Sequence, residues 1–176
     1  MNSCKWLPDI IECSNLSEWK VYEDKLYELF VNTFINNHPT FNNKPVYIKK
    51  YPLDGHREHA FIHLTCKTES DNPKDVNDRL PDLRRAERIT WIKPVIENYP
   101  CLENCLNCNK IKYWEEIHRN KLRINLFFED FRYIIVLEDR GNYYLLITAY
   151  YIHYDKVLEK KRNKYIQYCK QKKPLS

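Results

Sequence analysis

Polar side chains recur at alternate positions between residues 59 and 67, and their types suit chemistry on a phosphate. The set is His59, His63, Thr65 and Lys67. Histidine takes up and releases protons near neutral pH, and a lysine ammonium group stabilises phosphate charge. The apolar residues between them predict a β-strand with one polar face, because successive strand side chains point to opposite sides. The alternative is a solvated sheet face whose histidines have no catalytic role.

Three arginines lie within five residues of one another, at Arg84, Arg85 and Arg88. The forked guanidinium group matches the oxygens of a phosphate, so such a cluster is suited to bind anions. Apolar residues at helical spacing predict a helix over residues 82–93, with a kink or a break at its end because Pro94 disfavours α geometry in the residue before it, and a short second helix over 95–99. The alternative is that nearby acidic residues neutralise the arginines in surface ion pairs.

The segment at residues 143–152 predicts a strand in which Tyr144, Leu146, Thr148 and Tyr150 share one face. The hydroxyl groups of Thr148 and Tyr150 are able to bond to a phosphate or to position a ribose 2′-hydroxyl. Threonine and tyrosine are also common in strands that carry no site, which is the alternative interpretation.

A cysteine cluster offers a possible structural zinc site. The candidate ligands are Cys101, Cys105, Cys108 and His118. Zinc accepts three thiolates and one imidazole, and the pair spacings fall within the usual range. The arrangement does not match the common pattern of two separated CxxC pairs, and the alternative is a loop of free, reduced cysteines.

The composition excludes several classes of protein. Only 2 glycines occur in 176 residues, too few for a glycine-rich phosphate loop of the P-loop or Rossmann type. A net charge of +5 and 14 tyrosines allow a polyanionic partner without requiring one. The first residues do not resemble a secretory signal, no apolar run is long enough to span a membrane, and seven cysteines is an odd number. We therefore expect a cytoplasmic protein without a membrane partner.

The remaining patterns place these candidates in one α+β domain covering residues 1–176. We expect N-terminal helices packed on a twisted antiparallel sheet, followed by a basic C-terminal helix. The helical part is expected at about 1–40, with a helix over 17–37, and the sheet-containing core at about 45–152. Alternation and turn signals predict three consecutive strands and a terminal helix, at residues 121–128, 132–138, 143–152 and 155–173.

Three sequence blocks together resemble a phage-associated branch of the barnase–EndoU–colicin–RelE-like (BECR) nuclease fold. They are FIHLT at residues 61–65, LRRAERITWIKPVIEN at 83–98 and YYLLITAY at 143–150. The blocks span about half of the chain. The resemblance implies a ribonuclease (a hydrolase of toxin type) that needs no metal or other cofactor for catalysis. In such enzymes the ribose 2′-hydroxyl attacks the adjacent phosphate and leaves a 2′,3′-cyclic end. The cysteine cluster interrupts the family pattern.

Carried over to this chain, the resemblance implies roles for the polar residues already singled out. The implied catalytic residues are His63, Arg88, Thr148 and Tyr150. His63 is the expected base, Arg88 the charge that stabilises the phosphorane, and Thr148 the group that positions the phosphate, with Tyr150 or His59 as the acid. The residues expected to hold the substrate are His59, Thr65, Lys67, Arg84 and Arg85.

The implied partners are RNA and a protein antitoxin or immunity protein. Other functions remain compatible with the sequence. A non-catalytic RNA-binding or phage anti-defence protein would use the same basic and aromatic surface. A metal-dependent nuclease would use His56, His59 and His63, although few acidic residues accompany them. A purely structural phage or partner-binding module would use the polar strand face as an interface.

Overall fold

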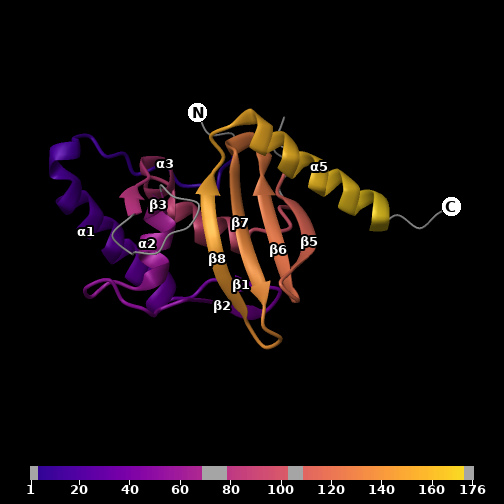
Figure 1. Cartoon of the computed structure of the whole chain (residues 1–176), viewed down its shortest axis with the longest axis horizontal. Helices are drawn as coiled ribbons and strands as arrows, with labels where there is room; N and C mark the ends of the chain where they lie inside the picture. The colour runs from indigo at the N-terminus through magenta and orange to yellow at the C-terminus, as the bar shows by residue number, and fades with distance from the viewer. Residues whose placement is uncertain (1–3, 69–78, 103–108, 173–176) are drawn as a thin grey trace.

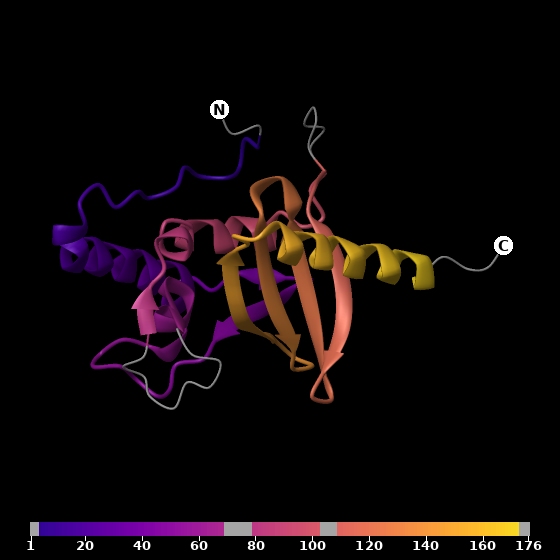
Figure 2. The ribbon, with the colours of Figure 1, turned by 45° about the horizontal axis from the view of Figure 1, so that its top comes forward.

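A computed structural model of the protein describes residues 4–68, 79–102 and 109–172, and its centre is a curved six-stranded sheet (Figures 1 and 2). The strand order is β1-β2-β8-β7-β6-β5, and a separate pair joins β3 to β4. The strands are β1 (Thr40–Phe41), β2 (Lys44–Ile48), β3 (Cys66–Thr68), β4 (Arg79–Pro81), β5 (Lys112–His118), β6 (Lys121–Phe128), β7 (Tyr133–Asp139) and β8 (Tyr144–Tyr151). All strand pairs are antiparallel except β2–β8, which is parallel, so the sheet is mixed.

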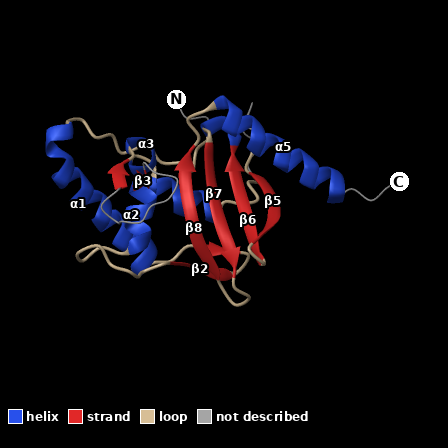
Figure 3. Ribbon diagram, in the orientation of Figure 1, coloured by secondary structure: helices blue, strands red, loops and turns tan. Residues whose placement is uncertain are grey.

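The α-helices are α1 (Trp19–Phe30), α2 (His59–Thr65), α3 (Leu83–Ala86), α4 (Ile92–Glu97) and α5 (Asp155–Lys172). Helices α1, α2 and α3 lie beside β8, whereas α5 begins near the end of β8 and runs across toward β5 (Figures 1 and 3). A π-helical turn (Val31–Ile35) extends α1, and short 3-10 turns occupy Leu16–Glu18, Ile89–Trp91 and Glu129–Phe131. The predicted α+β class and the basic C-terminal helix are confirmed. In the part of the chain that the structure describes, no helix combines the length and the apolar character needed to cross a membrane.

Two hydrophobic clusters pack against opposite faces of the sheet. The larger one joins α1–α4 to side chains such as Ile135 and Leu137 of β7. The smaller one lies under α5 and includes Ile134 and Val136 of the same strand. Because side chains alternate along a strand, each β7 residue belongs to the cluster on its own side. The sheet is therefore covered by helices on both faces.

The three strands β6, β7 and β8 lie where alternation predicted them, but a β-bulge changes the faces of β8. Val136 pairs with Thr148 while the next residue, Leu137, pairs with Leu146. The extra residue Ile147 shifts the alternation by one position. Tyr144 and Leu146 therefore face the larger cluster, whereas Thr148 and Tyr150 face α5. The prediction that all four share one face is wrong.

The segment predicted as a polar-faced strand at residues 59–67 is the helix α2 followed by β3. Phe61, expected on the polar face, is fully buried and packs edge-on against the rings of Tyr27 and Phe30 of α1. Short apolar runs fit a strand and a buried helix equally well, so packing against α1 decided the outcome. Thr65 is also fully buried, and its hydroxyl donates to the Phe61 carbonyl oxygen at 2.9 Å.

The helix predicted over residues 82–93 is broken earlier than expected. α3 ends at Ala86, and Ile89–Trp91 forms a 3-10 turn before α4 begins at Ile92. Pro94 lies inside α4, because its missing N–H falls in the first turn, where no intrahelical acceptor exists. Strand β5 at the sheet edge was not predicted.

Candidate active site at the end of β8

β7 pairs with β8 along its whole length on one edge, whereas on the other edge the C-terminal half of β8 lies against α2 and α3. β2 pairs only with Tyr144, Leu145 and Leu146. Beyond that point α2 and α3 lie against β8, as Figure 1 also shows. Side chains from α3 therefore reach the last residues of β8.

Arginines surround the two tyrosines that end β8. The guanidinium of Arg85 lies 5.3 Å from the ring centre of Tyr150. Around the Tyr151 ring, Arg88 lies at 4.8 Å, Arg84 at 5.9 Å and Arg132 at 6.0 Å. Cations at these distances are attracted to the negative face of an aromatic ring. Because neighbouring strand residues point to opposite faces, Arg84 and Arg85 of α3 contact tyrosines on both faces at the end of β8.

A pocket of about 300 Å³, here named the His153 pocket, gathers acid–base groups and cations. The residues that line it include Lys67, Asp82, Arg85, Tyr150 and His153. The imidazole Nε2 of His153 lies 3.8 Å from a carboxylate oxygen of Asp82, close enough for an ion pair when the imidazole is protonated. The pocket thus combines a proton-transfer group with two fixed positive charges.

Asp82 is held rigidly where it faces His153. It caps the N-terminus of α3 by accepting a hydrogen bond from the Arg85 amide at 3.3 Å, and it is only 8% exposed. Its other oxygen lies 3.4 Å from Arg85 Nε. Arg85 in turn donates to the carbonyl oxygens of His63 and Cys66. These contacts join α2, α3 and the carboxylate into one unit.

The chain around His153 is held by Arg132, which has a left-handed backbone conformation (φ 52°) just before β7. Its guanidinium donates to the carbonyl oxygens of Ile152 and His153, at 2.8 and 3.0 Å. A third donor binds Asp155 at the start of α5 at 2.7 Å. Arg132 therefore fixes the connection between β8 and α5 on which His153 lies.

Tyr150 is suited to donate a proton. Burial raises the pKa of its phenol above the ordinary value, and the nearby Arg85 charge offsets part of that rise. A phenol with a raised pKa stays protonated at neutral pH. It can therefore give a proton to a leaving oxygen.

The predicted site residues are divided among three places. Lys67, Arg85 and Tyr150 meet in the His153 pocket, while Arg84 and Arg88 surround Tyr151. His59 and His63 lie one turn apart on α2, with ring centres 6.1 Å apart. They line a separate pocket of about 220 Å³. The other residues that line it are Lys49, Ala60, Leu64, Leu145, Leu146 and Ile147. We name this the α2 pocket.

The other predicted residues lie away from the His153 pocket. Thr148 is half-buried in β8 beside Val136 and lines none of the pockets described here. Thr65, predicted to bind substrate, is buried and bound to its own helix, so it offers no hydroxyl to a ligand at the surface. None of these pockets contains His63, Arg88 and Tyr150 together.

The proposed zinc ligands lie partly outside the described residues. Cys101 is buried and His118 is exposed at the end of β5, but Cys105 and Cys108 belong to the range 103–108, which the structure does not describe. Among residues 4–68, 79–102 and 109–172, no group of three or more His, Cys, Asp or Glu side chains is arranged to hold a metal ion. Structural zinc therefore stays a prediction.

Sequence reasoning did not single out His153. It lies in the short connection between β8, which ends at Tyr151, and α5, which begins at Asp155, and functional side chains are frequent in such connections. Its partner Asp82 is 71 residues earlier by chain number, so no local spacing links the two. Comparisons of the chain with protein-family models, with curated proteins and with solved structures found no match.

Proposed function

We propose that the protein is a metal-independent endoribonuclease of toxin type that works in the cytoplasm. The observation that carries the proposal is the His153 pocket, in which His153 and Asp82 lie beside Lys67, Arg85 and Tyr150. Cleavage of RNA through a cyclic phosphate needs a base, an acid and positive charge at the phosphate. This pocket supplies all three from side chains alone. The odd number of cysteines favours a reducing compartment.

In the proposed reaction, His153 removes the proton from a ribose 2′-hydroxyl, and the 2′-oxygen attacks the adjacent phosphorus. The bond between phosphorus and the 5′-oxygen breaks, and Tyr150 gives its proton to the leaving oxygen. Lys67 and Arg85 stabilise the additional negative charge of the phosphorane. Asp82 stabilises the imidazolium that forms on His153. The products are a 2′,3′-cyclic phosphate and a free 5′-hydroxyl.

This assignment moves the base from His63, the residue expected from the sequence, to His153. His153 lies within ion-pair distance of a buried carboxylate and shares its pocket with two cations and a phenol. His63 belongs to the α2 pocket, whose other lining residues are mostly apolar. Asp82 is placed to orient His153 and to stabilise its protonated form, which suits His153 to act as the general base.

The test is incubation of the purified protein with total cellular RNA, with EDTA and then with added magnesium. We expect cleavage that survives EDTA and leaves 2′,3′-cyclic phosphate ends, and loss of cleavage in His153→Ala. His56→Ala is the matched control, because His56 is exposed and lies outside the pockets described here.

Two outcomes would contradict the proposal. Activity that disappears with EDTA and returns with magnesium would mean metal-dependent hydrolysis. RNA binding without any cleavage would favour a non-catalytic RNA-binding protein. A protein antitoxin, the second partner that we propose, would be detected as a co-expressed chain that blocks cleavage.

A further inference from the structure

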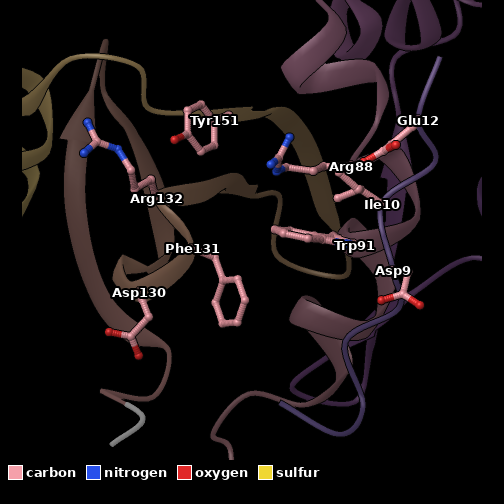
Figure 4. A pocket seen from close by; sticks show the side chains of 9 residues that line it. All are labelled: Asp9, Ile10, Glu12, Arg88, Trp91, Asp130, Phe131, Arg132 and Tyr151. Carbon is pink, nitrogen blue, oxygen red and sulfur yellow. The ribbon is translucent and has the colours of Figure 1, made fainter. Parts of the chain in front are cut away.

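A third pocket is also lined by Tyr151, and its chemistry differs from that of the His153 pocket. We name it the Trp91 pocket. Its volume is about 490 Å³, within the usual range for small-molecule sites. The side chains used below are Asp9, Glu12, Arg88, Trp91, Phe131 and Tyr151, shown in Figure 4.

Three aromatic rings form its walls. Trp91 and Phe131 meet edge to face, with ring centres 5.6 Å apart, and Tyr151 stands across the pocket from Trp91 (Figure 4). The indole of Trp91 is fixed because its Nε1 donates to the Pro8 carbonyl oxygen at 2.8 Å. Trp91 is only 3% exposed, whereas Phe131 and Tyr151 are half-buried, so the rings of Phe131 and Tyr151 are the faces open to a planar, conjugated ligand that binds by stacking.

A buried hydrogen-bond donor points into the same space. Arg88 is 7% exposed, and its guanidinium lies 5.0 Å from the Trp91 ring centre and 4.8 Å from that of Tyr151. One of its terminal nitrogens donates to the Arg84 carbonyl oxygen and lies 3.2 Å from the Glu87 carboxylate. Its Nε has no hydrogen-bond partner in the described part of the chain. A buried donor without a partner is costly, so an acceptor on a ligand would satisfy it.

Carboxylates stand at the mouth of the pocket. Asp9 and Glu12 are exposed, and the segment that carries them is tied down between two helical layers. The amide of Ile11 donates to the Glu87 carbonyl oxygen at 2.9 Å, and the Tyr22 hydroxyl donates to the Ile11 carbonyl oxygen at 2.7 Å. These carboxylates repel a phosphate and accept hydrogen bonds from N–H groups.

We propose that the Trp91 pocket binds a nucleobase that flanks the scissile phosphate and that it prefers bases with an exocyclic amino group over uracil. The inference rests on the proposed ribonuclease function, with the phosphate in the His153 pocket and the base beyond Tyr151. The amino group donates to Glu12 or Asp9, while a ring nitrogen or carbonyl oxygen accepts from Arg88. Uracil carries O4 where cytosine carries its amino group, so an acceptor would then face the carboxylates.

The test compares cytosine with uracil, which differ at that position. The substrates are oligothymidylate strands that contain one ribonucleotide, with uracil on both sides of the scissile phosphate or with cytosine replacing uracil on one side at a time. We expect cleavage about 10-fold faster with cytosine on one of the two sides, as is usual for one well-placed base contact. Glu12→Gln, alone or with Asp9→Asn, should remove this preference, because an amide both donates and accepts. Glu18→Gln, an exposed carboxylate outside the pocket, should leave it unchanged.

A binding measurement separates this inference from the ribonuclease proposal. All-deoxy strands of deoxycytidine and deoxyuridine cannot be cleaved through a 2′-hydroxyl and have the same phosphates, so the difference between their affinities reports base recognition without cleavage. We expect tighter binding of deoxycytidine and loss of that difference in Glu12→Gln. Equal cleavage and equal binding of the two bases would overturn the base pocket and leave the ribonuclease proposal standing. A cytosine preference in binding without any cleavage would support the pocket and overturn the reaction.

Discussion

The His153 pocket and the α2 pocket both lie against β8, and each contains histidine and lysine, yet they differ in what surrounds those groups. The His153 pocket adds Asp82, Arg85 and Tyr150. The α2 pocket adds mainly aliphatic side chains, from Ala60, Leu64, Leu145, Leu146 and Ile147. A histidine becomes a useful base when other groups orient it and stabilise the charges that form. The comparison therefore favours the His153 pocket, which joins α3 to the end of β8, as the catalytic site.

The most direct test of this comparison replaces one histidine in each pocket. His153→Ala should reduce RNA cleavage by about 10²–10⁴-fold, the usual cost of losing a general base. His63→Ala should reduce it by much less, because His63 lies in the α2 pocket. Initial rates on a fluorescent oligonucleotide measure both effects, and circular dichroism checks that each variant is folded. A large loss in His63→Ala with little effect in His153→Ala would move the site to the α2 pocket.

A second test concerns the acid. Tyr150→Phe should lower the cleavage rate by about 10²-fold, since the phenol is the proposed proton donor and phenylalanine keeps the ring. Because burial raises the pKa of Tyr150, the phenol remains the protonated donor throughout the neutral range. The wild-type rate should then show no loss from phenol ionisation until the pH exceeds 10, the ordinary value for tyrosine. A pH–rate profile that falls near neutrality in wild type and not in Tyr150→Phe would contradict this role.

A third test uses pH to loosen one region selectively. Glu129 joins β5 to α5 through ion pairs with Lys112 and Arg162. Burial alone raises the pKa of Glu129, but these two cations outweigh it and hold that pKa below its ordinary value. Its contribution to stability is therefore present above the ordinary pKa and lost as the pH falls through the lowered one.

Glu129→Gln should thus lower the free energy of unfolding at pH 7 and reduce its decline at acid pH. Urea unfolding at pH 7 and pH 3 measures both changes. Since α5 begins just after His153, we expect hydrogen exchange to rise at the end of β8 more than in α2. Equal acid sensitivity of wild type and Glu129→Gln would contradict the predicted contribution.

The smallest expected effect concerns the basic helix α5. Lys160 is exposed, whereas Lys164 forms an ion pair with Glu116, so we expect Lys160 to be free to contact an RNA phosphate. Lys160→Gln should weaken RNA binding slightly and reduce the salt slope of log K by about 0.7–0.9. Lys164→Gln should change the slope less. Titrations of each variant with RNA at several salt concentrations measure both slopes. An unchanged slope in Lys160→Gln would indicate that α5 is a solvated surface that does not contact RNA.

Sequence patterns predicted the elements whose structure is set by local contacts. Alternation over residues 121–128 and the turn at Gly141 gave β6, β7 and β8 nearly as observed, because neighbouring antiparallel strands need only a short turn. The residues predicted as the inner side of a terminal helix lie in α5, and the lysines and arginines make that helix basic as predicted. These inner-side residues are Leu158, Tyr165 and Cys169. In the site, the arginine cluster of α3 and Tyr150 were also visible as residues of the right type.

Only the tertiary structure decided the features that join distant segments. Packing of Phe61 against α1 made residues 59–65 a helix, and one extra residue at Ile147 turned Thr148 and Tyr150 to the other face of the sheet. The approach of His153 to Asp82 joins chain positions that no periodic pattern connects. Short segments satisfy more than one local pattern with similar free energy, so burial against the rest of the molecule selects among them.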